Sequence, residues 1–300
     1  MNECDVFIIG AGPAGMTAAL YAMRYGESVV LADQGAPGGQ LLLIDEIENY
    51  PGLGKVKGFE LAENMEKELG KLGLSATFME VSSIKKDGNK FKISTSEGEY
   101  EAKAVIIATG AGHRELGLEN EKHLVGRGIS YCATCDGPFF KGKDVVVVGG
   151  GDTALTDALY LSKIANRVHL VHRRNEFRGQ KVLSDKVRSN EKITLHLSHQ
   201  VVNANEEGGK LSSVELENGE VIKADGLFIF VGITPNSSFL GSLVETENGF
   251  VVTNGKMETS LEGVYAIGDV RNTPLRQVST AVGDGAIAAF EVDEYLKRKS

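Results

Sequence analysis

The strongest constraint on the fold is a pattern that occurs twice in this 300-residue chain, once around Gly10 and again around Gly149. Each time a short apolar run ends in a glycine-rich turn, a helix-like stretch follows, and a second apolar run ends in charged residues. A strand, a glycine turn, a helix and a second strand form the unit that binds a dinucleotide at the helix N-terminus. Two copies predict an α/β chain of two doubly wound, Rossmann-like domains.

The first copy carries Gly10, Gly12 and Gly15, and its second apolar run ends at Asp33. Its expected elements are a strand at 6–9, a helix at about 16–25 and a strand at 29–32. Gly10 permits a tight turn, Gly12 lets the backbone approach a pyrophosphate, and Gly15 lets the helix pack against the strand. The Asp33 carboxylate suits ribose hydroxyls and repels a 2′-phosphate, so this copy suits FAD or NAD and not NADP.

The second copy carries Gly149, Gly151 and Ala154, which is the variant of the fingerprint that ends in alanine. Its expected elements are a strand at 145–148, a helix reaching about 165 and a strand at 168–171. Basic residues at 172–174 and Arg178 follow, where the first copy has a carboxylate. Arginines at this point suit the 2′-phosphate of NADP(H), although a solvated basic surface remains the alternative interpretation.

Charge and hydropathy exclude two kinds of partner. The formal net charge of −9 argues against a nucleic-acid-binding protein with a general basic face. No apolar run reaches the 18 residues that a membrane span needs, so no membrane partner is expected. The acidic N-terminal segment lacks the basic start of a signal peptide, so a cytoplasmic location is expected.

The three cysteines are too few for a disulfide framework. Cys4 lies beside the first strand and is expected to be inert, whereas Cys132 and Cys135 form a Cys-x-x-Cys motif that can close a reducible ring. A zinc site is the competing interpretation, but the sequence lacks a second pair of ligands. Asp136 is either a proton shuttle for the thiols or simply the start of a turn with the Gly-Pro at 137–138.

From Val6 to about Ala289 the chain resembles the low-molecular-weight thioredoxin reductases. The segments that carry the resemblance are 10–15, 38–41, 48–52, 108–110, 132–137, 172–174, 177–178, 268–269 and 276–277. The resemblance implies a split FAD domain at 1–113 and 242–300, with an NADP domain inserted at 114–241. It also implies a homodimer and hinges near His113 and Gly241.

In that family electrons pass from NADPH through FAD and the Cys132–Cys135 disulfide to thioredoxin. The resemblance implies that Cys135 faces the flavin, that Cys132 attacks the protein substrate and that Asp136 is the proton donor.

The resemblance, together with the two fingerprints, also assigns the cofactor-binding residues. Those expected to hold FAD are Gly10, Gly12, Pro13, Ala14, Gly15, Asp33, Gln34, Gly39, Gln40, Leu41, Asn49, Val81, Thr109, Gly110, Gly268, Asp269, Arg276, Gln277 and Val278. Those expected to hold NADPH are Gly149, Gly150, Gly151, Asp152, Thr153, Ala154, His172, Arg173, Arg174, Arg178 and Gln277. No metal site is expected.

The chain departs from the family pattern at three positions. Thr156 replaces a carboxylate of the second helix, Gly179 stands where alanine is common, and Asp33 replaces the more usual Glu. The first two bear on the affinity for NADPH, so a related reductase that takes electrons from ferredoxin or another donor is one alternative. A non-enzymatic flavin redox sensor is a second alternative, and a zinc-binding module is a distant third.

Overall fold

The computed structural model describes residues 2–44 and 46–299 and divides the chain into two compact units. The split unit consists of residues 1–112 and 234–300, and the inserted unit consists of residues 113–233. Among the described residues, no helix is both long and apolar enough to cross a membrane.

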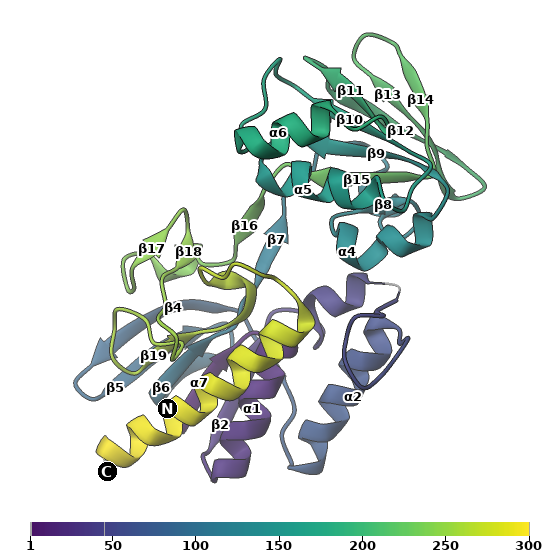
Figure 1. Ribbon diagram of the computed structural model, residues 1–300. Coiled ribbons are helices and arrows are strands. Elements are labelled where there is room, and N and C mark those ends of the chain that lie inside the picture. Colours follow the sequence, from purple (N-terminus) through teal and green to yellow (C-terminus); the bar gives the residue numbers. More distant parts are fainter. Residues whose placement is uncertain (1, 45, 300) are drawn as a thin grey trace. The chain divides into compact units, whose positions relative to one another are not determined.

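The split unit is built on a seven-stranded sheet with the order β3-β2-β1-β6-β5-β4, in which β19 also pairs with β6 (Figure 1). These strands are β1 (Asn2–Ile9), β2 (Val29–Asp33), β3 (Thr77–Phe78), β4 (Val81–Asp87), β5 (Lys90–Thr95), β6 (Gly98–Ile107) and β19 (Val264–Ala266). The pairs among β3, β2, β1, β6 and β19 are parallel, whereas β4, β5 and β6 form an antiparallel meander.

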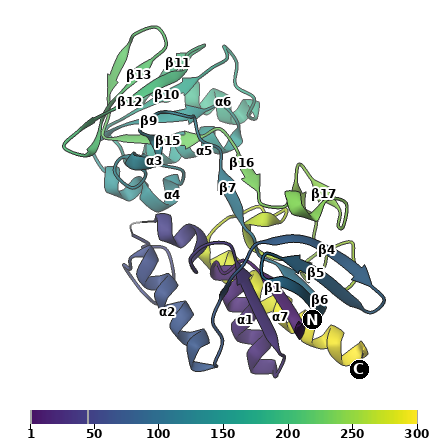
Figure 2. The same ribbon diagram turned by 180° about the vertical axis from the view of Figure 1, so that it is seen from behind.

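Helices cover one face of this sheet. They are α1 (Pro13–Tyr25), α2 (Gly58–Lys71) and α7 (Val278–Lys299), and α1 and α7 run side by side in both views (Figures 1 and 2). Because side chains alternate along a strand, Val6 and Ile8 face the helices, while Phe7 and Ile9 face the opposite core. That second core also contains residues of two shorter elements, η3 (Ser238–Leu240) and β18 (Phe250–Val251), and β18 pairs with the exposed strand β17 (Thr246–Glu247).

The inserted unit repeats this plan with a five-stranded parallel sheet in the order β11-β10-β9-β15-β8. The strands are β8 (Ile129–Ser130), β9 (Asp144–Gly149), β10 (Arg167–His172), β11 (Ile193–Leu197) and β15 (Gly226–Phe230). One face packs on α5 (Asp152–Leu161) and α6 (Lys181–Arg188), and the other on the antiparallel sheet of β12 (Val201–Glu207), β13 (Lys210–Leu216) and β14 (Val221–Lys223). The short helix α3 (Glu121–Leu124) precedes β8.

The predicted fold class is confirmed, because both units have a parallel sheet with helices against it and one is inserted into the other. The strand order β3-β2-β1-β6 of the split unit recurs as β11-β10-β9-β15 in the inserted unit. The strand predicted at 145–148 is β9, and it is buried on both faces, with Val145 and Val147 in one core and Val146 and Val148 in the other. The helix predicted to reach about 165 ends earlier, at Leu161, where the backbone turns and Ile164 O accepts a hydrogen bond from Gly142 N.

The boundaries between the units differ from the expected ones. The first crossing lies after residue 112, and the second lies after Ile233 and not near Gly241. Residues 234–241 belong with the split unit because Asn236 bonds to the segment after β6, Ser237 Oγ donates to Gly249 O, and Leu240 is buried in the core there. The two crossings are β7 (Ala111–His113) and β16 (Ile233–Pro235), which pair in a two-stranded ribbon.

Candidate redox and nucleotide-binding sites

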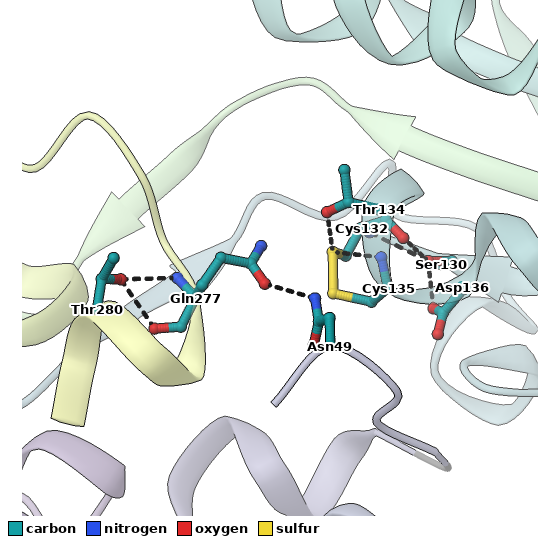
Figure 3. The surroundings of a disulfide bond; sticks show 8 residues. All are labelled: Asn49, Ser130, Cys132, Thr134, Cys135, Asp136, Gln277 and Thr280. Carbon is teal, nitrogen blue, oxygen red and sulfur yellow. Dashed lines mark hydrogen bonds between the residues drawn. A yellow bond between two sulfur atoms is a disulfide. The ribbon is translucent and has the colours of Figure 1, made fainter. Parts of the chain in front are cut away.

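The two sulfurs of the Cys-x-x-Cys motif are bonded to each other. Cys132 is the N-cap of the one-turn helix α4 (Ala133–Asp136), which brings the Cα atoms of Cys132 and Cys135 to 5.3 Å (Figure 3). Cys135 N donates a hydrogen bond to Cys132 Sγ at 3.2 Å. Both side chains are partly exposed. A partly exposed sulfur that accepts a backbone N–H is suited to carry a thiolate after reduction, so the geometry fits the redox interpretation.

Asp136 does start a turn with Gly137 and Pro138, as one of its two interpretations expected, but its side chain does not cap that turn. The η2 turn (Gly137–Phe140) starts directly after Asp136 and receives no side-chain cap. The carboxylate instead accepts a hydrogen bond from Ser130 Oγ at 2.5 Å, and that oxygen accepts one from Cys132 N at 3.0 Å (Figure 3). Ser130 was not predicted, and a serine two residues before a cysteine gives no recognisable sequence signal.

A buried carboxylate fixes the chain just before the redox motif. Glu121 is 1% exposed and accepts hydrogen bonds from the backbone N–H groups of residues 116–118 and from Tyr131 Oη at 2.7 Å. Burial and the Glu121 carboxylate raise the pKa of Tyr131, so its hydroxyl stays a donor. The ring of His113 stacks on Tyr131 with centroids 4.9 Å apart. Sequence reasoning missed Glu121, because only the tertiary structure brings its donors together.

The first glycine loop has the shape that a pyrophosphate requires. A Cβ on Gly10 would lie 2.3 Å from Ala108 O, and one on Gly15 would lie 1.8 Å from Gly10 O, so both positions exclude side chains. A Cβ on Gly12 would meet nothing within 4 Å. Gly12 is the N-cap of α1, and Pro13 and Ala14 form the first turn. Because no side chain caps this helix end, open space lies before free N–H groups, which is where an anion binds.

Asp33 closes β2 and holds the loop itself. Its Oδ2 accepts a hydrogen bond from Ala11 N at 2.6 Å, and its Oδ1 accepts one from Gly35 N at 2.7 Å. Each carboxylate oxygen has a second lone pair, so both can still accept a ribose hydroxyl. The shorter side chain of Asp therefore combines loop closure with the predicted ribose role, and Gln34 lies exposed beside it.

The other residues predicted to hold FAD lie on six segments of the split unit. Gly39, Gln40 and Leu41 form the start of η1 (Gly39–Leu43), Val81 opens β4, Thr109 and Gly110 follow β6, and Arg276, Gln277 and Val278 lead into α7. Asn49 Nδ2 donates to Gln277 Oε1 at 2.9 Å (Figure 3), which joins two segments far apart in the sequence. Asn236, which was not predicted, joins Thr109 and Gly110 to the returning chain through three hydrogen bonds.

Two of these residues keep polar groups that the protein does not satisfy. Among the described residues, the buried Nε of Arg276 has no hydrogen-bond partner and the Asp269 carboxylate accepts no hydrogen bond. Burial raises the pKa of Asp269, and the guanidinium of Arg276 offsets part of that effect. Arg276 also lies 4.6 Å from the ring centroid of Phe250. A buried polar atom without a partner, as at Arg276 Nε, is typical of a site for a polar ligand, so this part of the split unit fits FAD.

Gly268 and Asp269 belong to η4 (Gly268–Val270), and two unpredicted residues hold this turn. Asp284 on α7 accepts hydrogen bonds from Gly268 N at 3.0 Å and from Arg271 Nε at 2.8 Å. Their positions in the sequence give no sign of this pairing, because η4 and α7 meet only in the folded unit.

The second glycine loop also combines a glycine that excludes a side chain with one that faces open space. A Cβ on Gly149 would lie 2.6 Å from Phe230 O, whereas one on Gly151 would meet nothing within 4 Å. Gly151 is the uncapped N-terminus of α5, and Asp152, Thr153 and Ala154 form its first turn. A Cβ on Gly150 would lie 2.3 Å from the ring of His172, so this glycine makes room for the imidazole. Burial, and to a lesser degree the nearby arginines, lower the pKa of His172.

Arg173, Arg174 and Arg178 present free cationic groups. All three are exposed, and within residues 2–44 and 46–299 none of their guanidinium groups makes a hydrogen bond or ion pair. The loop that carries them closes over the phosphate loop, because Arg178 N donates to Gly150 O at 2.7 Å and Gln180 N donates to Asp152 Oδ1 at 2.6 Å. Free guanidinium donors beside an uncapped helix N-terminus fit a phosphorylated ribose.

Close packing explains why glycine occupies position 179. A Cβ there would lie 2.7 Å from Leu155 Cδ1 and 3.1 Å from Asp152 N, so glycine lets the arginine loop approach the start of α5. Thr156 is exposed on α5, one residue before Asp157, whose pKa burial raises to about 6.

Comparisons with known proteins agree with this geometry. A family described as "Pyridine nucleotide-disulphide oxidoreductase" matches residues 4–285. The chain belongs to this family. The thioredoxin reductase of Bacillus subtilis (strain 168) is 44% identical, covering 98% of this chain and 95% of that protein. The thioredoxin reductase of Treponema pallidum (strain Nichols) is 43% identical, with 98% of both chains covered.

A solved structure shows the same fold. The crystal structure of thioredoxin reductase from Streptococcus pyogenes MGAS5005 has a TM-score of 0.94 and 44% identity, and the match covers 99% of both chains. The chain is thus an oxidoreductase of the pyridine nucleotide-disulphide family with the fold of the low-molecular-weight thioredoxin reductases, as the sequence indicated. FAD and NADPH are the cofactors of these enzymes, and the two glycine loops fit them.

Proposed function

We propose that this protein is an NADPH-dependent thioredoxin-disulfide reductase in which Cys132 and Cys135 are the redox-active pair. The observation that carries the proposal is the Cys132–Cys135 disulfide. It is formed within the unit that also holds the second glycine loop and three arginines without partners among the residues that the structure describes. The relatives that match almost the whole chain bear the name thioredoxin reductase. This combination is what electron transfer from NADPH to a protein disulfide requires.

Each site residue has a task that its geometry supports. Bound FAD would accept a hydride from NADPH and supply electrons to the disulfide. The split unit would hold FAD through the Gly12 loop, Asp33, Asp269 and the residues around Gln277. The inserted unit would hold the pyrophosphate of NADPH at Gly151.

The guanidinium groups of Arg173, Arg174 and Arg178 would bind the 2′-phosphate of NADPH. Once the disulfide is open, the hydrogen bond from Cys135 N favours the thiolate of Cys132, which would attack the substrate disulfide. Asp136 would carry a proton at this site.

The ferredoxin-type alternative and the redox sensor are less well supported. A reductase that takes electrons from another donor does not need free arginines beside a second phosphate loop, yet Arg173, Arg174 and Arg178 are unpaired among the described residues. A sensor that only reports the redox state of its flavin does not need that second loop either. The closing of the arginine loop over α5 therefore favours NADPH.

A single purified sample tests the proposal. The FAD-loaded protein is mixed anaerobically with NADPH or NADH in a stopped-flow spectrometer, and flavin bleaching is followed. We expect NADPH to bleach it much faster, and subsequent Bacillus subtilis thioredoxin to reoxidise it. Equal bleaching by the two nucleotides would contradict the NADPH assignment, and bleaching without thioredoxin reduction would contradict the reductase.

We also propose that the protein is a homodimer. Support comes from large apolar side chains that the split unit leaves exposed, among them Leu43 at 61% and Phe59 at 53%. Light scattering after gel filtration should give twice the chain mass of 32.1 kDa, and a monomer mass would contradict this. We propose a cytoplasmic location, because a thiol-reducing enzyme that draws on NADPH operates where thiols are kept reduced.

A further inference from the structure

Ser130 occupies the centre of the polar contacts around the disulfide. It closes β8 and is 3% exposed. Its Oγ lies 2.5 Å from Asp136 Oδ2, 3.0 Å from Cys132 N and 3.2 Å from Cys132 O (Figure 3). One buried hydroxyl thus joins the carboxylate that follows the redox pair to the backbone of the first cysteine.

The hydroxyl can serve this carboxylate in both of its protonation states. A serine hydroxyl has one proton to donate and two lone pairs to accept. When Asp136 is ionised, Ser130 donates to it and accepts from Cys132 N. When Asp136 is protonated, its O–H can donate to Ser130 Oγ, and the serine proton can turn to Cys132 O. That carbonyl also accepts from Asp136 N at 3.1 Å, so Ser130 Oγ, Asp136 Oδ2 and Cys132 N each keep a partner in both states.

We propose that Ser130 is a positioning residue for proton transfer at the redox pair. Resting on the proposed reductase function, this inference states that Ser130 holds the Asp136 carboxyl against the turn of Cys132 and Cys135 while a proton enters and leaves it. Opening the disulfide takes two electrons from NADPH and two protons, and gives two thiols. In the return step the two enzyme thiols give up their protons and an electron pair, the Cys132–Cys135 bond forms again, the substrate disulfide breaks, and each of its sulfurs takes up one proton. Asp136 accepts one of the protons that the enzyme thiols release and passes it to a sulfur that leaves.

The donated hydrogen bond favours the ionised form of Asp136 more than the protonated form, because a bond to a charged acceptor is the stronger one. Loss of the hydroxyl should therefore move the titration that depends on Asp136 to higher pH. Other titratable groups near this turn must be separated from it. The helix α5 packs against α4 and carries Asp152, which binds Gln180 N, and Asp157, whose pKa burial raises to about 6. The two cysteines and Tyr131 also lie at this turn, and Tyr131 contacts two further titratable groups, Glu121 and His113.

The test compares pH–rate profiles for NADPH-driven reduction of Bacillus subtilis thioredoxin by the FAD-loaded protein. Asp136→Asn should abolish one limb of the profile. In Ser130→Ala we expect that limb to move up by about one pH unit and kcat to fall about tenfold. The reason is that a general acid transfers its proton less efficiently once the hydrogen bond that positions it is gone. Ser130→Thr keeps the hydroxyl and should restore the limb. Ser130→Gly is a second variant without the hydroxyl.

Three controls separate positioning from folding. Ser162→Ala removes another buried hydroxyl of the inserted unit, which donates to Leu159 O at 2.8 Å, and it should leave the limb in place. Asp157→Asn should also leave that limb in place. Bleaching of the flavin by NADPH should keep its wild-type rate in the Ser130 variants. A fall in kcat together with slower bleaching and an unmoved limb would make Ser130 merely structural and overturn the proposal.

A second measurement works without either substrate. The protein is reduced with dithiothreitol, and alkylation of the pair by iodoacetamide is followed against pH. The curve for Ser130→Ala should shift in the same direction as that for Asp136→Asn, because both reduce the negative charge beside the thiols. Unchanged curves would overturn the role of Ser130. If wild-type protein fails to reduce thioredoxin, the proposed function fails, but the alkylation curves still decide this inference.

Discussion

Replacement of both Arg173 and Arg174 by glutamine should weaken NADPH specifically. Neither guanidinium group makes a hydrogen bond or ion pair within the described part of the chain, and both side chains are exposed. Their removal therefore costs the fold little, within about 0.5 kcal/mol as for ordinary surface positions. With the 2′-phosphate bound, each arginine is expected to donate a charge-assisted hydrogen bond that contributes about 1.5–3 kcal/mol. Since 1.4 kcal/mol corresponds to a factor of ten, the KM for NADPH should rise about tenfold or more per bond.

The assay is steady-state flavin-dependent turnover with NADPH and NADH, together with a thermal unfolding midpoint for each variant. NADH lacks the 2′-phosphate, so its KM should hardly change. Arg167→Gln is a matched control, because Arg167 is an exposed arginine at the opposite end of β10 that donates to Thr194 Oγ1. Equal weakening of both nucleotides would mean that the arginines support the fold or the shared pyrophosphate. No weakening of either would mean a solvated surface cluster and would favour a donor other than NADPH.

Three further predictions concern other parts of the chain. Cys135→Ser should leave flavin bleaching by NADPH intact and abolish thioredoxin reduction. The control Cys4→Ser, the same change outside the pair, should leave both bleaching and thioredoxin reduction unchanged. Loss of bleaching in folded Cys135→Ser would refute the proposed order of electron transfer. Glu121→Gln should lower the free energy of unfolding by about 1–3 kcal/mol in urea, because an amide cannot accept from Tyr131 and three backbone N–H groups at once; an unchanged midpoint would show that this buried carboxylate is not needed. Asp157→Asn should stabilise the protein above pH 6 by up to about 3 kcal/mol, because burial raises the pKa of the Asp157 carboxyl from 3.8 to about 6. The protonated carboxyl contributes its full stability below pH 3.8 and loses it as the pH rises to 6. A thermal midpoint that the substitution shifts equally at pH 4 and pH 7 would contradict this.

The sequence alone predicted the architecture of both units and the glycine loops that they carry. The glycine turns can be predicted from the sequence because only glycine tolerates the close approach of backbone atoms at Gly10 and Gly149. The strand at 145–148 can be predicted because β9 is buried on both faces and is therefore apolar throughout. The Cys-x-x-Cys spacing likewise favoured a disulfide over a zinc site, and the structure has it, since two intervening residues form the single turn that brings Cys132 and Cys135 together.

The tertiary structure decided what depends on contacts between distant segments. The second crossing between the units lies at Ile233 and not near Gly241, because hydrogen bonds from Asn236 to the segment after β6 tie the returning chain to the split unit. The supporting polar residues Ser130 and Glu121 could not be predicted for the same reason. A hydroxyl or carboxylate shows its role only when the fold places its donors and acceptors within reach, and no local pattern records which ones those are.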